Sequence, residues 1–408
     1  PHCGARLDRL PDCRWHSSMF AIVAFGLLVC WSNAVGGLIL AQLKALGWTD
    51  NSTTATFSAI TTAGMFLGAL VGGIIGDKTG RRNAFILYEA IHIASMVVGA
   101  FSPNMDFLIA CRFVMGVGLG ALLVTLFAGF TEYMPGRNRG TWSSRVSFIG
   151  NWSYPLCSLI AMGLTPLISA EWNWRVQLLI PAILSLIATA LAWRYFPESP
   201  RWLESRGRYQ EAEKVMRSIE EGVIRQTGKP LPPVVIADDG KAPQAVPYSA
   251  LLTGVLLKRV ILGSCVLIAM NVVQYTLINW LPTIFMTQGI NLKDSIVLNT
   301  MSMFGAPFGI FIAMLVMDKI PRKTMGVGLL ILIAVLGYIY SLQTSMLLIT
   351  LIGFFLITFV YMYVCYASAV YVPEIWPTEA KLRGSGLANA VGRISGIAAP
   401  YAVAVLLS

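Results

Sequence analysis

Charged residues are scarce in this chain of 408 residues. Only 12% of its residues are Asp, Glu, Lys or Arg, whereas 56% are apolar and the mean hydropathy is +0.68. An ordinary soluble domain carries about 25% charged residues. The composition therefore excludes water as the main solvent of the chain and indicates a membrane protein.

Cysteine and histidine are also few, and neither supports a structural bridge. Five of the seven cysteines lie inside apolar runs, where a thiol normally packs as a small apolar group. His2, Cys3, Cys13 and His16 lie close together in the sequence, but their spacing is unlike that of known zinc sites. We therefore expect neither a disulfide framework nor a bound metal.

Signatures of catalysis are missing as well. The sequence contains no glycine-rich phosphate loop, no Ser/His/Asp order and no His/Glu metal pair. It therefore supports neither an enzyme nor a resident cofactor.

Long apolar runs fill most of the chain instead. Each is near the roughly 20 residues that a helix needs to cross the hydrocarbon layer. The sequence thus predicts an all-α polytopic membrane protein with eleven spanning helices. Their ranges are 17–40, 54–75, 83–101, 106–130, 145–165, 175–195, 259–285, 294–317, 324–341, 346–371 and 384–406.

The net charge of +10 is distributed by loop rather than gathered on one folded face. Basic residues concentrate before residue 17, in loops 78–82 and 319–323, and in segment 196–259. The alternate loops hold only Lys44, Arg175 and Lys293. By the positive-inside rule, we expect the N-terminus and the central segment to be cytoplasmic. The lipid bilayer, and not nucleic acid, is therefore the expected partner.

Two loop motifs occur twice in the same order. GDKTGRR (76–82) has a counterpart in MDKIPRK (317–323), and EYMPGRNRG (132–140) has one in EIWPTEAKLRG (374–384). The aspartates of the first pair are 241 positions apart, and the glutamates of the second pair are 242 apart. Such a repeat indicates two homologous halves. Because six predicted helices precede the central segment and five follow it, the repeat also predicts a twelfth helix beyond Ser408.

The halves and the segment between them give the expected domains. We expect an N-terminal bundle at 1–195, a cytoplasmic loop at 196–258 and a C-terminal bundle at 259–408. Within the loop, apolar residues recur at helical spacing between Glu and Lys residues, which predicts an amphipathic helix. These apolar residues are Ala212, Val215, Met216, Ile219 and Val223.

Several further motifs follow one another along the chain. They are GGIIGDKTGRR (72–82), RFVMGVGLG (112–120), Glu132 with Arg139, PESPRWL (197–203) and RGR (206–208). Together they resemble the major facilitator superfamily, in its sugar porter and metabolite:proton symporter branch, over essentially the whole chain. The resemblance implies two six-helix bundles with pseudo-twofold symmetry, around a central cavity that opens to one side at a time. It also implies a monomeric secondary transporter of a bacterial inner membrane, carrying a small-molecule substrate and protons.

The resemblance gives the charged loops a gating role. Ion pairs between the halves would hold the cytoplasmic side closed and would break when it opens. Because acids contribute little to topology, we favour gating over topology signalling for the paired acids and their partners. The eight gating residues are Asp77, Arg81, Glu132, Arg139, Asp318, Arg322, Glu374 and Arg383.

The first predicted span, 17–40 (helix 1), departs from the family pattern. Proton-coupled members of this branch usually carry an acid there, in a GYD stretch, but this sequence has CWSN (30–33) and no acid in the helix. Glu89 and His92, three residues apart in the predicted helix 83–101, form an acid–base pair inside a membrane segment. We favour a structural pair, because this helix is peripheral in the family that the chain resembles, and we keep Glu89 as the candidate proton site; uncoupled diffusion through the carrier also stays open.

The seventh predicted span, 259–285 (helix 7), departs from the pattern as well, since it lacks the double-Gln stretch by which sugar porters hold hydroxyl groups. Amide and aromatic residues in this and other helices can bind hydroxyls and cover the apolar faces of sugars. The predicted substrate is therefore a small polar metabolite, sugar-like or polyhydroxylated. The candidate binding residues are Asn33, Asn151, Tyr154, Asn271, Gln274, Asn279 and Tyr366.

Three other functions stay open. An organic-anion carrier needs a cation in the cavity, for which Arg112 and Arg145 are the candidates. A drug exporter would also use an aromatic cavity. A membrane sensor that binds a ligand without moving it would need a signalling domain, and none is visible.

Overall fold

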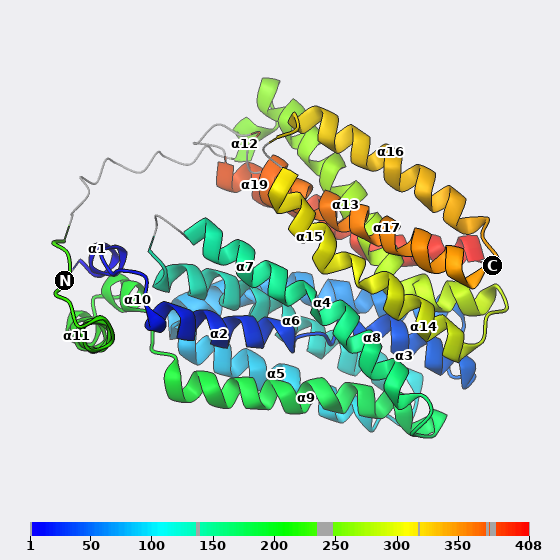
Figure 1. The fold of residues 1–408 in the computed structure, drawn as a ribbon, viewed down its shortest axis with the longest axis horizontal. Helices are drawn as coiled ribbons and strands as arrows, with labels where there is room; N and C mark the ends of the chain where they lie inside the picture. Colours follow the sequence, from blue (N-terminus) through cyan, green and yellow to red (C-terminus); the bar gives the residue numbers. More distant parts are fainter. Residues whose placement is uncertain are drawn as a thin grey trace. The chain divides into compact units, whose positions relative to one another are not determined.

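The computed structural model describes residues 2–135, 139–234, 248–316, 319–372, 375 and 381–407 (Figure 1). These residues are mostly helical, and no strand occurs in the described ranges. Nine of the helices found there are long and apolar enough to span a membrane. Each of the eleven predicted spans overlaps one helix or two consecutive helices, which confirms the all-α class.

The helices follow the predicted order along the chain. In the first half they are α2 (Arg14–Leu28), α3 (Val35–Ala45), α4 (Asn51–Thr79), α5 (Arg81–Ala100), α6 (Met105–Tyr133), α7 (Arg139–Asn151), α8 (Ser153–Leu164) and α9 (Ala170–Tyr195). In the second half they are α13 (Gly254–Thr287), α14 (Leu292–Met303), α15 (Gly305–Val316), α16 (Arg322–Ser341), α17 (Met346–Cys365), the π-helical turn η1 (Tyr366–Tyr371) and α19 (Lys381–Leu407). The remaining helices are α1 (Cys3–Asp8), α10 (Pro200–Ser205), α11 (Tyr209–Thr227) and α12 (Tyr248–Leu251).

Two predicted spans are each divided into two helices near a proline. α7 and α8 meet at Trp152, and α14 and α15 meet at Phe304. Pro155 and Pro307 each lie three residues after the break, where the missing N–H cannot complete the helical hydrogen bond. The residue 241 positions before Pro307 is Phe66, and α4 is continuous there. The breaks therefore follow the prolines.

The first predicted span is also divided, but without a proline. α2 ends at Leu28 and α3 begins at Val35, so the prediction of one continuous helix at 17–40 is wrong. Ser32 and Asn33 lie in the non-helical stretch, and side chains of these types compete with a helix for backbone hydrogen bonds. The backbone is therefore irregular where helix 1 lacks its acid.

Glycines bring α4 into close contact with α6. A Cβ atom added to Gly64 would lie 2.5 Å from the carbonyl oxygen of Phe113. One added to Gly68 would lie only 2.0 Å from the carbonyl oxygen of Val117. Small residues four apart commonly allow membrane helices to approach in this way.

The same contact occurs in the second half, between α15 and α17. Each of the four residues has a counterpart 241 positions later. Gly64 and Gly68 correspond to Gly305 and Gly309, and Phe113 and Val117 correspond to Phe354 and Thr358. A Cβ atom added to Gly305 would lie 2.6 Å from the carbonyl oxygen of Phe354, and one added to Gly309 would lie 2.3 Å from that of Thr358. Packing therefore repeats at the offset of the loop motifs, which supports two homologous halves.

Gly68→Ala is expected to destabilise the protein by about 1–3 kcal/mol, because the new methyl group would overlap the backbone of α6. Thermal unfolding of the purified protein in detergent measures this as a lower Tm. Gly328→Ala is the matched control, since nothing lies within 4 Å of a Cβ atom at that helical position. Equal Tm values for the two variants would contradict the close contact.

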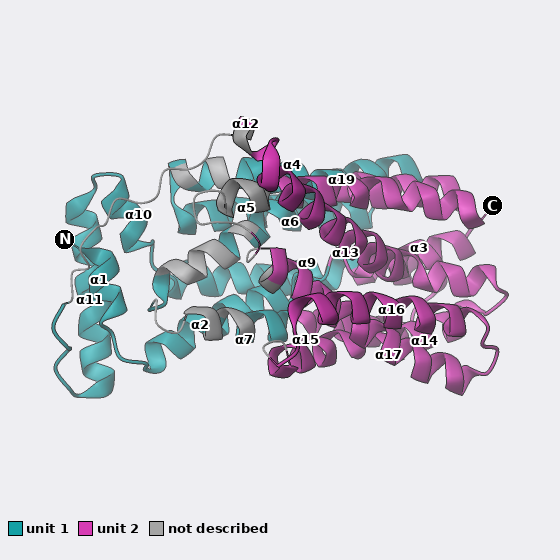
Figure 2. Ribbon diagram, turned by 90° about the horizontal axis from the view of Figure 1, so that it is seen from above, with its two compact units in different colours: residues 1–31, 63–150, 178–240 teal, residues 32–62, 151–177, 241–408 magenta. Residues whose placement is uncertain are grey.

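The chain forms two compact units that do not coincide with the predicted bundles (Figure 2). Unit 1 comprises residues 1–31, 63–150 and 178–240. Unit 2 comprises residues 32–62, 151–177 and 241–408. The division passes through α4 and α9, so unit 2 combines parts of the first half with the second half. The domain boundaries at 195 and 258 stay predictions.

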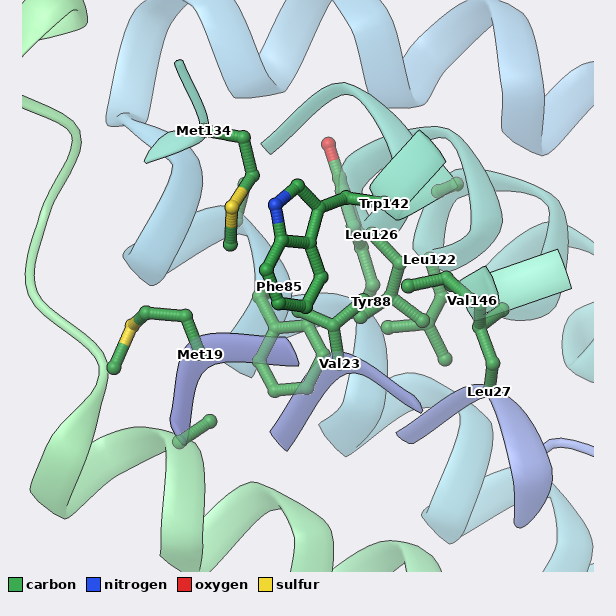
Figure 3. Close-up of a cluster of buried hydrophobic side chains, with 13 residues drawn as sticks. Met19, Val23, Leu27, Phe85, Tyr88, Leu122, Leu126, Met134, Trp142 and Val146 are labelled. Atoms are coloured by element: carbon green, nitrogen blue, oxygen red, sulfur yellow. The ribbon is translucent and has the colours of Figure 1, made fainter. Parts of the chain in front are cut away.

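The core of unit 1 lies among α2, α5, α6 and α7 (Figure 3). Met19 of α2 belongs to one buried cluster with Phe85 of α5, Leu126 of α6 and Trp142 of α7. Burying side chains of this size is worth about 1.5–3 kcal/mol each. This core fixes the helix that carries Glu89.

The amphipathic helix predicted in the central loop is α11, which packs with α1 and α10 in unit 1 (Figure 1). On its polar side, Arg6 of α1 pairs with Glu213 at 2.5 Å and with Glu220 at 2.7 Å. The hydrogen bond from Arg6 holds the pKa of the Glu213 carboxyl below its usual value. The buried residues of α11 are Ala212, Met216, Ile219 and Val223, which confirms the predicted apolar face.

Candidate functional site

Aromatic and amide side chains from three helices meet inside unit 2. The rings of Tyr154 on α8 and Tyr361 on α17 lie 5.4 Å apart between centroids. The Tyr361 hydroxyl also lies within electrostatic range of Gln274 and Tyr275 on α13. It is buried, and the side chains of Tyr154 and Gln274 lie near enough to be its hydrogen-bond partners, but neither contact has the geometry of a complete hydrogen bond. These four residues, the tyrosine–glutamine cluster, therefore hold a buried polar group that a ligand hydroxyl would satisfy.

Other tyrosines of α17 and η1 face different neighbours. Tyr363 donates a hydrogen bond to the carbonyl oxygen of Val266 on α13 at 3.1 Å. Tyr366 stacks on Tyr371 with centroids 5.1 Å apart, because the π-helical turn brings residues five apart into line. Its hydroxyl lies against α16, 2.6 Å from where a Cβ atom on Gly326 would be. The structure thus places Tyr366, a predicted binding residue, beside α16 rather than in the tyrosine–glutamine cluster.

The predicted asparagines are spread along unit 2. Asn271 is buried, and its amide donates to the carbonyl oxygen of Leu267 at 2.8 Å within α13. Asn279 is buried on the same helix, where α3 approaches closely. Asn33 is half-buried between α2 and α3, and Asn151 is half-buried at the end of α7. Of the seven predicted residues, the structure therefore brings Tyr154 and Gln274 into the cluster.

A buried contact near the cluster joins the two halves, and sequence reasoning missed it. Asn299 of α14 donates a hydrogen bond to the Ser158 hydroxyl of α8 at 2.8 Å, and both residues are buried. At the adjoining helix breaks, the rings of Trp152 and Phe304 lie 6.2 Å apart. The sequence did contain a signal for this contact. Ser158 and Asn299 are polar residues inside the apolar predicted spans 145–165 and 294–317, and such side chains commonly form hydrogen bonds between membrane helices.

Most of the predicted gating residues lie beyond what the structure describes. Arg81 is described, and its guanidinium donates to the carbonyl oxygen of Gly76 at 3.0 Å. Arg322 is described at the start of α16. Asp318 and Glu374 lie outside the described residues, as do the side chains of Asp77, Glu132, Arg139 and Arg383. The gating role stays a prediction.

A second buried polar group lies in unit 1, within the span of α5. Glu89 and His92 are fully buried, and Arg112 of α6 is 3% exposed. Thr189 of α9 donates to one carboxyl oxygen of Glu89 at 3.4 Å, whereas the other oxygen has no hydrogen-bond partner among the described residues. Arg112 lies within electrostatic range of His92, and Cys30 lies within range of Glu89. Because Cys30 lies in the break between α2 and α3, Glu89 approaches the place where helix 1 lacks its acid.

Comparison with known proteins gives one consistent family. The Major Facilitator Superfamily profile matches residues 20–400. The inner membrane metabolite transport protein YdjE of Escherichia coli K12 is 44% identical to this chain, over 99% of this chain and 89% of its own. The putative metabolite transport protein YyaJ of Bacillus subtilis 168 is 30% identical, over 96% and 86%. The E. coli xylose transporter XylE, in a partially occluded inward open conformation, has the same fold, with a TM-score of 0.74 and 17% identity over 96% of this chain and 92% of that one.

Proposed function

The chain belongs to the Major Facilitator Superfamily and is an integral membrane transporter, and we propose that it moves a small polar metabolite across a bacterial inner membrane by alternating access. The proposed substrate is sugar-like or polyhydroxylated, and the N-terminus is cytoplasmic. The observation that carries the proposal is the buried Tyr361 hydroxyl, which lies beside Tyr154 and Gln274 but completes no hydrogen bond of good geometry with either. Burying such a group without a partner costs about 1–3 kcal/mol, and a substrate hydroxyl would remove that cost.

The cluster around that hydroxyl suits a polyhydroxylated ligand. The Gln274 amide can both donate and accept hydrogen bonds, while the rings of Tyr154 and Tyr361 can cover an apolar ligand face. We therefore add Tyr361 to the binding residues inferred from the sequence. Ligand-induced thermal stabilisation across sugars, polyols, sugar acids and aromatic acids tests this assignment. A response to the acids alone would favour the organic-anion carrier instead.

Alternating access requires contacts that hold one side closed and can be released. In unit 2, the hydrogen bond between Asn299 and Ser158 joins a helix of the first half to one of the second. We place this end of unit 2 on the outer side of the membrane, following the predicted topology. A typical protein hydrogen bond is worth only about 1 kcal/mol net, so the contact can break and re-form during a transport cycle.

We further propose that Glu89 carries the coupled proton. Ionisable residues inside membrane segments commonly serve as proton relays in transporters. The groups that face this carboxyl or its neighbour His92 are the Thr189 hydroxyl, the Cys30 thiol and the Arg112 guanidinium. In this proposal, Glu89 on α5 takes the role of the acid that proton-coupled relatives carry on helix 1.

Asp77→Ala and Arg139→Ala are each expected to lower the transport rate several-fold while leaving substrate affinity nearly unchanged. A surface ion pair is worth only about 0–1 kcal/mol, but one made in a single state shifts the population of states directly. Uptake rates and binding constants of purified variants separate the two effects. Lys78→Ala is the control, because an isolated basic residue in a cytoplasmic loop is explained by the positive-inside rule alone. Wild-type rates in both variants would show that the gating role is wrong.

A further inference from the structure

A cavity of about 720 Å³ opens in unit 1 where the end of α9 meets α11. Three cationic side chains line it: Arg82 of α5, Arg208 directly before α11, and Lys214 within α11. Tyr195 also lines the cavity, at the end of the membrane-spanning helix α9. Aromatic side chains at such ends mark the level of the lipid headgroups. The cavity therefore lies at the membrane surface.

The two acids in the wall do not neutralise this cavity. Glu198 accepts the backbone N–H of Arg81 at 2.8 Å, at the N-terminus of α5, so the positive end of that helix already offsets its charge. Glu211 is paired with Arg208. Lys214 is exposed, and no ion pair to it occurs among the described residues. The cavity thus retains positive charge.

Arg82 lines this cavity and is held in place by α9. Its Nε is buried and has no hydrogen-bond partner in the described part of the chain. Its guanidinium lies over the ring of Trp193 on α9, 4.7 Å from the centroid, and donates to the Trp193 carbonyl oxygen. The contact holds Arg82 beside α9.

A second, shallow and more apolar groove runs along the surface of α9 itself. It is lined by Leu186, Ala190 and Trp193, with Thr189 and Arg194 as its polar members. Neighbouring apolar residues of this span are exposed, as expected of a face toward lipid. Trp193 lies in the wall of this groove and also holds Arg82, which lines the first cavity. The polar cavity and the apolar groove are therefore adjacent, on either side of Trp193.

We propose that the cavity and the adjacent groove form one binding site for an anionic phospholipid. The phosphate group lies between Arg82 and Lys214, and an acyl chain follows α9 past Ala190. Basic pockets at membrane helix ends bind anionic headgroups, and each nearby Lys or Arg contributes about 1 kcal/mol. The apolar groove favours a lipid over a free organic phosphate, because only a lipid has an acyl chain that can lie along α9 while its phosphate occupies the cavity.

Lipid binding to the purified full chain, measured by native mass spectrometry, tests the site. Phosphatidylglycerol is expected to bind several-fold more tightly than phosphatidylcholine. Arg82→Gln and Lys214→Gln should each weaken phosphatidylglycerol binding about fivefold. Arg225→Gln is the matched control, because Arg225 is on the same helix as Lys214, is largely exposed and lies outside the cavity lining. Ala190→Trp should weaken lipid binding by filling the groove.

Lys214→Gln decides the test should Arg82→Gln fold poorly, since Lys214 is an exposed surface residue. Equal binding of the two lipids, or equal effects of Lys214→Gln and Arg225→Gln, would overturn the proposal. Glycerol 3-phosphate should compete poorly with phosphatidylglycerol. Full competition by this soluble headgroup, with no effect of Ala190→Trp, would identify a site for soluble organic phosphates and overturn the assignment to lipid.

Discussion

Gln274→Ala is expected to lower substrate affinity and uptake about tenfold. The amide lies beside the buried Tyr361 hydroxyl on α17, and the Tyr361 ring in turn lies beside the ring of Tyr154. Removing the amide removes a donor and an acceptor for the substrate, and a net loss of about 1.4 kcal/mol corresponds to a tenfold change. Binding by ligand-induced thermal stabilisation and initial uptake rates should fall together, because the lost contact belongs to the binding step.

Two further variants make this result specific. Tyr361→Phe removes only the buried hydroxyl and keeps the ring, so it should weaken binding while leaving the fold intact. Gln343→Ala is the matched control, because Gln343 bonds to its own helix at the end of α16, away from the cluster. Unchanged affinity in both Gln274→Ala and Tyr361→Phe would show that the binding site lies elsewhere.

Glu89→Gln is expected to abolish accumulation driven by a proton gradient while preserving exchange of substrate across the membrane. With one proton per substrate, each unit of imposed pH difference supports about tenfold accumulation, since a tenfold ratio is worth about 1.4 kcal/mol. The amide keeps the size and the contact with Thr189, but it cannot bind and release a proton. Uptake into proteoliposomes with and without a pH gradient measures the difference.

Glu171→Gln is the control for this experiment, because Glu171 is an exposed acid at the start of α9. It should accumulate substrate as the wild type does. Gradient-driven accumulation by Glu89→Gln would show that the proton site is elsewhere and that Glu89 and His92 are a structural pair. Loss of both accumulation and exchange would likewise contradict a role limited to coupling.

Much of the fold could be predicted from periodic features of the sequence. The apolar face of α11 and the runs of membrane length identify helices directly. The loop repeat at 241 positions also predicts where glycines such as Gly68 and Gly309 recur, although their contacts with carbonyl oxygens needed the structure. The helix breaks near Pro155 and Pro307 followed a known rule, and hydropathy alone overlooked them because it averages over about 20 residues.

Side-chain direction could not be predicted in the same way. Tyr361 and Tyr366 belong to one continuous run, yet the first faces Tyr154 on α8 and the second lies against Gly326 on α16. The π-helical turn at Tyr366–Tyr371 aligns these two tyrosines, and no local propensity in the sequence specifies it. The approach of Glu89 to helix 1 likewise depends on tertiary packing, because the two segments are far apart in the chain.

The central claim is that this protein carries a polar metabolite across the membrane rather than only binding it, and counterflow tests that most directly. Proteoliposomes loaded with the compound identified by thermal stabilisation are diluted into a trace of the same compound carrying a label. We predict transient accumulation of label inside, at similar rates for the wild type and Glu89→Gln and about tenfold more slowly for Gln274→Ala. Stabilisation by the compound without any entry of label would contradict the claim and would identify a sensor that does not transport its ligand.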